Sequence, residues 1–292
     1  MAVESEWLVQ DQDFSVTLFA VKRRNFLMGA GVVTCGRVIA DEADIQQVNR
    51  LRVLCYNIHF CKGADERFDV ERIAKVIRAE APDLVALQEI DVRTKRSGKV
   101  HQLQMLAELT GMHGRFGPTQ DYHGGLYGNG ILSRHPFEDL LIEPLPYTPA
   151  SRDVITYPRG LIAATVSLGE GRSIRIVSTH FQHNLEEDRV AQAKAVNELF
   201  GDAEKDQIPT ILAGDINARP GSEPMKVLGD HWEHVAGIEM DQISAEEGGK
   251  WEIDHILLRK GDKLSAKETK IIDDRTASDH RPILAVIETA VR

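Results

Sequence analysis

Short apolar runs alternate with amphipathic segments from Leu51 almost to the C-terminus, and this alternation limits the fold of the chain more than any other feature. The stretches "LRVLCYNI", "DLVALQEI" and "PTILAGDIN" are nearly continuous apolar runs, which predict buried β-strands. Between the first two, "FDVERIAKVIRAEAPD" places its apolar residues on one helical face behind Asp69, a predicted N-cap. This pattern predicts sheets that are covered by helices on one face and by a second sheet on the other.

The same pattern continues without a Gly-, Ser- or Pro-rich linker, so residues 46–292 are predicted to form a single α/β (α+β) domain. We expect helices in "HQLQMLAELTG" and "EEDRVAQAKAVNELFG", which end at Gly111 and Gly201. The strands "RGLIAATVSL" and "SIRIVSTHF" are predicted to be joined by the turn "GEGR". Further strands are expected in "NGILSRHP", "EIDHILLR" and "PILAVIE", and residues 238–250 are the most loop-like interior segment.

Residues 1–45 are set apart as an N-terminal address segment. Lys22-Arg23-Arg24 precedes a short apolar run, and "RRNFL" resembles the core of a twin-arginine signal, with Ala40 at a predicted cleavage site. We therefore expect export to the periplasm or the exterior; the alternative is a cytoplasmic protein with an amphipathic N-terminal helix. The apolar run is far shorter than the roughly 20 residues that a spanning helix needs, so no stable transmembrane span is expected.

The charge and cysteine content exclude some classes of protein. The formal net charge of −10 argues against non-specific binding to nucleic acid, which needs Lys and Arg. A nuclease whose metal supplies the positive charge stays open. Three cysteines do not make a disulfide framework, and Cys55 and Cys61 are expected to be thiols rather than a pair. The sequence does not specify an oligomeric state.

Polar residues gather where the predicted strands begin or end. Taken singly, each of them has an ordinary structural interpretation as a turn former or a strand cap. Taken together, they predict a ligand site, because loops converge at such edges while the strands hold them rigid. The set consists of Asn57, Glu89, His180, Asp215, Asn217, Asp254, Asp279 and His280.

These motifs, in order, resemble those of the endonuclease/exonuclease/phosphatase superfamily, which includes deoxyribonuclease I, inositol polyphosphate phosphatases and bacterial sphingomyelinases. The matching stretches are "YNIH", "PDLVALQEID", "YGNGILSR", "STHF", "LAGDINARP", "EIDHIL" and "ASDHRPI", over about residues 50–290. The chain looks most like the bacterial metal-dependent hydrolase branch. The resemblance implies a four-layer α/β/β/α sandwich of two packed mixed β-sheets flanked by helices. It departs from the family pattern at Ile216, where Phe is commoner, and at His255, where Tyr or Arg is frequent.

The resemblance also implies a metal site at Glu89 with Asn57, to which Asp279 contributes from the opposite side. Oxygen ligands of this kind suit Mg²⁺, which retains several waters, and Mn²⁺ is able to substitute. Zinc is disfavoured, because its sites have closer His or Cys spacing.

Two histidines are implied to carry the proton transfers, each oriented by a carboxylate. By resemblance, His180 pairs with Asp254, whereas His280 lies near Glu89 or Asp279. His280 is the candidate base or the group that holds the attacking water, and His180 would bond a phosphoryl or leaving oxygen.

Five further residues complete the predicted site. Asp215 and Asn217 would orient the nucleophile and phosphate, and Asp215 is the alternative base. Arg96, Asn129 and Arg159 flank the motifs, where they would contact a substrate phosphate or be solvated.

The predicted function is that of a divalent-metal-dependent phosphoesterase. Its substrate would be a phosphodiester or phosphomonoester of a small or lipid head group, with DNA or RNA less favoured. One alternative is a secreted or cytoplasmic nuclease. Another is a binding protein that kept the fold but lost catalysis, since a fold does not guarantee a function.

Overall fold

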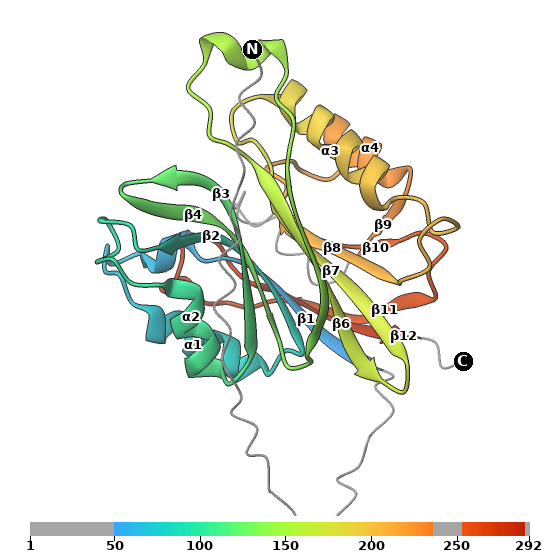
Figure 1. Ribbon diagram of the computed structural model, residues 1–292, viewed down its shortest axis with the longest axis horizontal. Coiled ribbons are helices and arrows are strands. Elements are labelled where there is room, and N and C mark those ends of the chain that lie inside the picture. The colour runs from blue at the N-terminus through green and yellow to red at the C-terminus, as the bar shows by residue number, and fades with distance from the viewer. Residues whose placement is uncertain (1–49, 236–252, 290–292) are drawn as a thin grey trace, which may run out of the picture. The chain divides into compact units, whose positions relative to one another are not determined.

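The computed structural model describes residues 50–235 and 253–289, which lie within one compact unit, Gln46–Arg292. The predicted signal in residues 1–45 and the predicted loop at 238–250 lie outside the described residues. The described chain forms two six-stranded sheets, with helices at both sides of the pair (Figure 1).

The first sheet has the strand order β11-β12-β1-β2-β4-β3. It is mixed, because β1 and β2 are parallel while the other neighbours are antiparallel. Its strands are β1 (Arg50–Asn57), β2 (Leu84–Val92), β3 (His113–Tyr122), β4 (Gly125–Ser133), β11 (Leu264–Ile271) and β12 (Ile283–Thr289).

The second sheet has the strand order β5-β6-β7-β8-β10-β9 and is also mixed. Its parallel pair is β7 and β8, and the remaining neighbours are antiparallel. Its strands are β5 (Phe137–Pro144), β6 (Gly160–Gly169), β7 (Arg172–His180), β8 (Thr210–Asp215), β9 (Trp232–His234) and β10 (Asp254–Arg259).

Strand periodicity explains how the sheets stack. Alternate residues of a strand point to opposite faces, so β1 sends Val53 and Cys55 into the core between the sheets and Leu54 and Tyr56 into the core beneath the helices. That second core receives the apolar faces of α1 (Val70–Glu80) and α2 (Gln102–Thr110).

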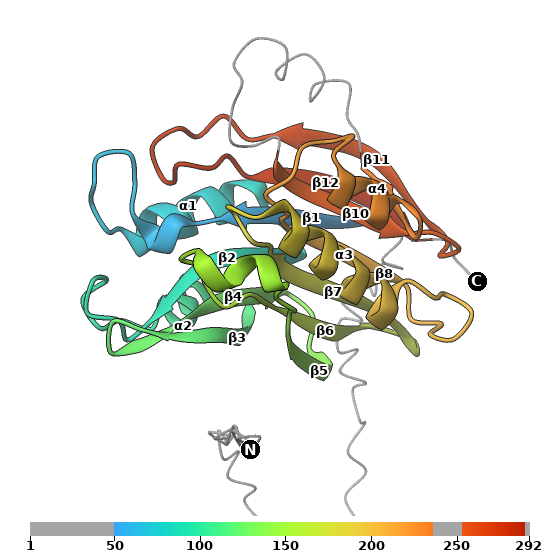
Figure 2. The same cartoon turned by 90° about the horizontal axis from the view of Figure 1, so that it is seen from above.

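The other sheet is covered in the same way on its outer face. Residues of β7, β8 and β10 share a third core with α3 (Glu186–Phe200) and α4 (Glu223–Gly229). Figure 2 shows α3 in front of β7 and β8, with α4 next to it in front of β10. The predicted four-layer sandwich is therefore confirmed, and two short 3₁₀ segments, η1 (His59–Cys61) and η2 (Pro149–Asp153), complete the described elements.

Several local predictions are confirmed. Asp69 caps α1 by accepting a hydrogen bond from the backbone N–H of Arg72 at 2.9 Å. The backbone turns left-handed at Gly111, where α2 ends, and α3 ends before Gly201. Cys55 and Cys61 are buried free thiols. Within the described residues, no helix is long and apolar enough to span a membrane.

Four strands were absent from the sequence prediction: β3, β5, β9 and β11. Their burial patterns explain this, because most of their residues are exposed or half-buried and no continuous apolar run marks them. β3 and β11 lie at the two edges of the first sheet, and β5 and β9 lie at the two edges of the second. Their pairing partners, rather than their own composition, make them strands.

Hydrogen bonds between buried side chains join the two sheets close to one end of the sandwich. Gln88 on β2 donates through Nε2 to Ser178 Oγ on β7 at 3.1 Å, and that hydroxyl donates to the Leu87 carbonyl at 3.0 Å. Within the first sheet, Ser278, which precedes β12, donates to the carbonyl of Asn57 at 2.8 Å. These bonds fix the strand ends that carry the predicted site.

A close approach of two strands gives a prediction about stability. A Cβ added at Gly214 on β8 would lie 2.1 Å from the carbonyl oxygen of Thr179 on β7. We expect Gly214→Ala to lower the free energy of unfolding by about 1–3 kcal/mol, as overpacking does, measured by urea denaturation. The matched control is Gly229→Ala at the end of α4, where no atom lies within 4 Å of the added Cβ. Equal destabilisation by both variants would contradict the close-approach argument.

Candidate active site

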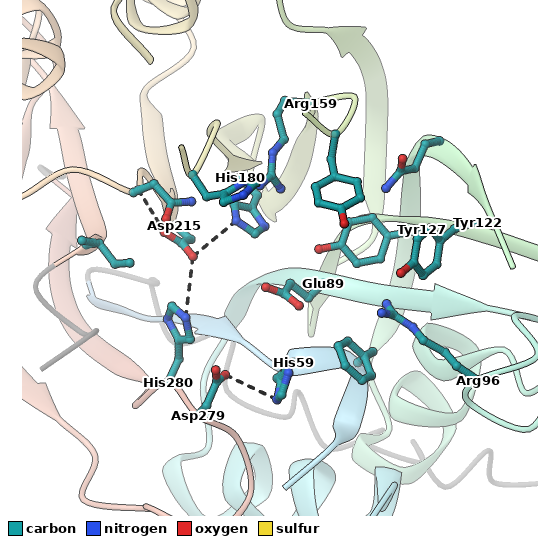
Figure 3. Close-up of a pocket in the computed structure, with 16 residues that line it drawn as sticks. His59, Glu89, Arg96, Tyr122, Tyr127, Arg159, His180, Asp215, Asp279 and His280 are labelled. Atoms are coloured by element: carbon teal, nitrogen blue, oxygen red, sulfur yellow. Dashed lines mark hydrogen bonds and ion pairs between the residues drawn. The ribbon is translucent and has the colours of Figure 1, made fainter. Parts of the chain in front are cut away.

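A cavity of about 460 Å³ opens at the strand ends and is lined by residues from both sheets (Figure 3). Most of the predicted site residues share it. Its lining includes Glu89, Arg96, Arg159, His180, Asp215, Asn217, Asp279 and His280. Asn57, Asp254 and Asn129 are buried and do not belong to the lining.

Glu89 reaches the cavity because β2 is interrupted at this residue. The register of β2 against β4 shifts between Leu87 and Ile90, so that Gln88 and Glu89 together face Asn129. Glu89 has a φ of 60°, in the left-handed region that non-glycine residues seldom adopt. β2 therefore does not end at Glu89, as the sequence suggested, but continues to Val92 beyond a β-bulge. Such bulges redirect a side chain next to active sites.

Asn57, the last residue of β1, joins two carboxylates with one amide. Its Nδ2 donates to Glu89 Oε1 at 3.1 Å and to Asp215 Oδ2 at 3.0 Å. Its Oδ1 accepts a hydrogen bond from the backbone N–H of His59 at 3.1 Å. The fully buried amide therefore fixes the position of Glu89 relative to Asp215 across the two sheets.

Asp215 lies at the centre of a row of polar residues on the second sheet. Register pairs it with His180 on β7 and with Asp254 on β10. Its Oδ1 accepts from the backbone N–H of Asn217 at 2.9 Å. Burial, and then the neighbouring Asp254 charge, raise the pKa of Asp215 to about 7.

His280 makes the shortest side-chain contact of the site. Its Nδ1 lies 2.6 Å from Asp254 Oδ2, and its Nε2 lies 3.8 Å from Asp215 Oδ2. Burial alone would lower the pKa of His280, but the attraction of Asp254 and the hydrogen bond to it raise that pKa to about 10. His280 is therefore a buried imidazolium paired with a carboxylate.

The predicted pairing of His180 with Asp254 is wrong. Since β8 lies between β7 and β10, Asp215 separates the two residues, and His180 Nε2 is 3.4 Å from Asp215 Oδ2 instead. Asp254 is taken by His280, which the prediction had placed near Glu89 or Asp279. Burial, followed by the charges of Arg159 and His280, lowers the pKa of His180 well below its ordinary value, so this imidazole is neutral.

Asp279 lies on the opposite wall of the cavity. Its Oδ1 is 3.5 Å from Nδ1 of His59, and Figure 3 shows both residues facing Glu89 across the cavity floor. Asn217 adopts a left-handed φ of 52° and donates through Nδ2 to the carbonyl of Phe181 at 3.0 Å. Its side chain thus ties the loop after β8 to the end of β7.

Two groups of side chains have the chemistry to bind a cation. Asp215, Asp254 and His280 bring their ligand atoms within 4.8 Å of one another, a spacing that could hold a metal ion. The other group is Glu89 with Asp279, which are both carboxylates that line the cavity. In the first group, the Nδ1 of His280 is already bonded to Asp254.

Arg96 forms one end of the cavity. Its Nε and Nη2 donate to both oxygens of the buried Asp91 at 2.8 and 2.9 Å. Its guanidinium carbon lies 3.6 Å from the ring centre of Phe60 and 4.5 Å from that of Tyr122. The structure thus brings Arg96 into the site, as predicted, within an aromatic cluster that the sequence did not reveal.

Asn129 is not brought into the cavity, so its predicted contact with a substrate phosphate is wrong. It is 2% exposed, and its Nδ2 donates to the carbonyl of Gly160 at 2.9 Å. Asn129 lies on β4 opposite the bulge in β2, and its side chain bonds β6 of the second sheet instead of reaching the cavity. Its contribution is to hold the backbone next to Arg159.

Sequence reasoning missed the aromatic residues of the cavity. Phe60, Tyr122, Tyr127 and Tyr157 line it together with Gln120. Tyr127 is the first residue of the quoted motif "YGNGILSR" and was within reach of motif analysis. Tyr122 and Gln120 lie on β3, a strand that no apolar run marks, so no signal in the sequence pointed to them.

Comparison with known proteins identifies the family. The model of the endonuclease/exonuclease/phosphatase family matches residues 54–280, a range that contains Glu89, Asp215 and His280. The chain belongs to this family. The Escherichia coli protein YbhP is 26% identical over 275 residues, covering 84% of this chain and 98% of YbhP.

Solved structures agree with this assignment. An endonuclease/exonuclease/phosphatase from Beutenbergia cavernae has a TM-score of 0.66 and 26% identity, covering 83% of this chain and 72% of that one. A mannosyl-6-phosphatase from Bacteroides thetaiotaomicron has a TM-score of 0.65 and 19% identity, covering 81% and 99%. The catalytic domain of human Nocturnin, with bound sulfate, has a TM-score of 0.63 and 19% identity, covering 84% of this chain and 95% of that one. The mannosyl-6-phosphatase and the Nocturnin domain therefore have the same fold as this chain.

The buried pair of His280 and Asp254 gives a prediction about the titration of His280. Asp254→Asn removes the charge that holds the proton on His280, so the pKa of His280 should fall from about 10 by about 1–3 pH units. Imidazole nitrogen chemical shifts measured by NMR against pH would report it. Because the folded-state pKa is raised, the pair stabilises the fold fully below the free-histidine pKa of 6.5 and loses that contribution as the pH rises through about 10. An unchanged His280 titration in Asp254→Asn would contradict the assignment.

Proposed function

We propose that this family member is a divalent-metal-dependent phosphoesterase, which hydrolyses a phosphate ester by attack of an activated water. One observation carries the proposal: a single cavity combines the carboxylate of Glu89, the carboxylate of Asp215 and the imidazolium of His280. Phosphoryl transfer needs a placed water, neutralised charge on the phosphoryl oxygens and a stabilised leaving group. The three groups are suited to these tasks, and a binding protein would not need all of them.

Glu89 is the residue best suited to hold the metal. Asn57 occupies one of its carboxylate oxygens with a hydrogen bond, and the Glu89 side chain lines the cavity, where Asp279 faces it. Carboxylate oxygens with room for waters suit Mg²⁺, and Mn²⁺ would substitute. Asn57 contributes mainly by positioning Glu89, since its own oxygen accepts from His59. When bound, the metal would neutralise charge on the phosphoryl oxygens.

The alternative cation group, Asp215 with Asp254 and His280, is better explained as proton-transfer machinery. A positively charged His280 would repel a cation, and freeing its Nδ1 would break the 2.6 Å bond to Asp254. Without a cation in this group, Asp254 would stay paired with His280, and Asp215 would contact the attacking water.

Asp215 is the proposed general base, in place of His280. His280 already carries its proton at neutral pH, so it cannot accept another, whereas Asp215 has a pKa of about 7. A base with a pKa near the working pH is the efficient one. Asn57 and Asn217 hold the Asp215 carboxylate by hydrogen bonds, so its lone pairs have a fixed direction.

The two histidines would then serve as hydrogen-bond donors. His280, kept cationic by Asp254, would hold a phosphoryl oxygen next to Asp215. The neutral His180 lies on the other side of Asp215, where it would bond a phosphoryl oxygen or the leaving oxygen. Neither role needs a change in protonation before the water attacks.

The size and charge of the protein favour a small or lipid head-group ester over a nucleic acid. A cavity of about 460 Å³ lies toward the small end of ligand pockets, which span roughly 300–1,000 Å³. The net charge of −10 works against binding a polyanion. A nuclease would instead show a basic stripe next to the cavity.

Metal dependence is the first test of this proposal. Purified protein should hydrolyse p-nitrophenyl phosphate or bis-p-nitrophenyl phosphate with Mg²⁺ or Mn²⁺, and chelation should abolish the activity. Asp215→Asn should lower kcat by at least ~10²-fold, as removal of a positioned base does. Asp230→Asn, a change after α4 and away from the cavity lining, is the matched control. Full activity in chelator and in Asp215→Asn would refute the mechanism.

The pH dependence distinguishes Asp215 from His280 as the base. The base must be deprotonated, so kcat/KM should rise with pH up to about 7 through ionisation of Asp215. A bound cation would move this limb to lower pH. The rate should fall again near pH 10, where His280 loses its proton. If His280 were the base, kcat/KM would instead keep rising up to about pH 10, where His280 loses its proton. Asp254→Asn should shift both limbs to lower pH, because the charge of Asp254 raises the pKa of Asp215 as well as that of His280.

We also propose that the protein is exported, on the strength of the twin-arginine resemblance of "RRNFL". Replacing Arg23 and Arg24 with Lys should retain the precursor in the cytoplasm, as followed by fractionation and immunoblotting in a bacterial host. A matched control is the double change of Arg50 and Arg52 to Lys, which leaves the signal intact. Unchanged export of the Arg23/Arg24 variant would refute this assignment.

A further inference from the structure

Arg159 is a buried arginine without a carboxylate partner. It is 6% exposed, its Nε has no hydrogen-bond partner, and among residues 50–235 and 253–289 no Asp or Glu forms an ion pair with it. Its Nη2 lies 3.4 Å from Nδ1 of His183. An unpaired buried charge is strongly unfavourable unless a ligand balances it.

Arg259 shows how this chain treats a buried arginine that has a structural role. It is 1% exposed and pairs with Asp262 at 2.9 Å, and its Nη1 and Nη2 also donate to the backbone carbonyls of Phe200, Asp206 and Ile208. Arg96, at the far end of the cavity, is likewise neutralised by Asp91. Arg159 lacks such compensation, which suggests that its partner is not part of the chain.

The fold aims Arg159 into the cavity. The carbonyl of Arg159 accepts from the Leu145 N–H at 2.9 Å, and the carbonyl of Gly160 accepts from Asn129 Nδ2 at 2.9 Å and Thr179 Oγ1 at 3.2 Å. These bonds fix the backbone on both sides of the residue. Figure 3 shows the Arg159 side chain directed into the cavity beside His180, on the same side as Asp215. The guanidinium is thus held ready next to the reacting position.

The charges of the other groups determine what Arg159 would balance. The charge of His280 is already matched by Asp254, so that pair is neutral overall. A phosphodiester carries one negative charge, whereas a phosphomonoester carries close to two at neutral pH. An additional uncompensated guanidinium therefore favours the monoester, and its planar donors suit two phosphoryl oxygens at once.

We propose that Arg159 is a specificity-determining residue, which selects the dianionic phosphate of a monoester of a small alcohol over a phosphodiester. The inference rests on the proposed phosphoesterase function and narrows its substrate class. Arg159 would contact the phosphoryl oxygens that a diester uses to carry its second substituent. Asn129 would be a positioning residue, since it holds the backbone that carries Arg159.

Competitive inhibition separates the two phosphate classes directly. Inorganic phosphate represents the dianion, and dimethyl phosphate represents the diester monoanion. In the wild-type protein, phosphate should inhibit hydrolysis at least ~10-fold more strongly than dimethyl phosphate. Arg159→Met should weaken inhibition by phosphate by about 10- to 100-fold, the range for one charge-assisted hydrogen bond, and change that by dimethyl phosphate by less than about 3-fold.

Substrate selectivity gives an independent measurement. The ratio of kcat/KM for p-nitrophenyl phosphate to that for bis-p-nitrophenyl phosphate should fall by about 10- to 100-fold in Arg159→Met and be partly restored in Arg159→Lys. Arg152→Met is the matched control, because Arg152 is exposed in the same loop and does not line the cavity. It should leave both the ratio and the inhibition constants unchanged.

Thermal unfolding tests the inference without catalysis. Removal of an unpaired buried charge should leave the unfolding midpoint of Arg159→Met at or above that of the wild type. Inorganic phosphate should raise the midpoint of the wild type by several degrees, without added metal, and raise that of Arg159→Met much less.

The outcomes are separable from those of the proposed function. Metal-dependent hydrolysis with a diester preference, or with equal loss for both esters in Arg159→Met, would overturn this inference and leave the phosphoesterase intact. A midpoint about 4 °C or more below wild type would show that Arg159 is structural and would also overturn it. Absence of all hydrolysis would refute the proposed function. In that case, an equal rise of the unfolding midpoint with inorganic phosphate in the wild type and in Arg159→Met would refute the inference as well.

Discussion

The site depends on one buried amide that links the two sheets. Asn57 ends β1 in the first sheet, and its Nδ2 bonds both Glu89 of the same sheet and Asp215 of the second. Its backbone carbonyl in turn accepts from Ser278, which precedes the final strand. Because these groups are buried, each missing hydrogen bond would leave an unsatisfied polar atom in the interior. The apolar core between the sheets holds them together, and the Asn57 amide fixes their relative position at the active site.

Around that amide, burial converts ordinary side chains into groups with distinct charges. Asp215 and Asp254 share a region of low dielectric, and their mutual repulsion favours a proton on one of them. His280 relieves the repulsion by taking a positive charge next to both, whereas His180, on the far side of Asp215, stays neutral. Two histidines of the same intrinsic pKa thus receive opposite charge states from the groups that surround them.

Much of this arrangement could be predicted from the sequence, because strand-end residues such as Asn57, Asp215 and His280 are marked by the apolar runs beside them. The layers followed from the same runs, and the family from the series of motifs. The partnership of His280 with Asp254 could not be predicted, since it joins a residue just before β12 of the first sheet to β10 of the second, and the stacking of two sheets leaves no local trace in the sequence. Tyr122 was missed because it lies on β3, which has no apolar run of its own and forms a strand through its pairing with β4. Asn129 was assigned to the substrate since a motif shows which residues recur together but not which way each faces.

The β-bulge in β2 has a consequence for how relatives of this protein could lose activity in evolution. Val85 and Leu87 before it, and Ile90 and Val92 after it, all enter the same helix-side core, although the two pairs differ in parity along the chain. Glu89 is therefore the surplus residue that resets the alternation. Loss of one residue here would restore a regular strand, in which Val85, Leu87, Ile90 and Val92 would alternate in step toward the same core. A relative could discard its chemistry through one codon and remain fully folded, so a missing residue in this strand is a sharper sign of lost catalysis than divergence elsewhere in the sheets.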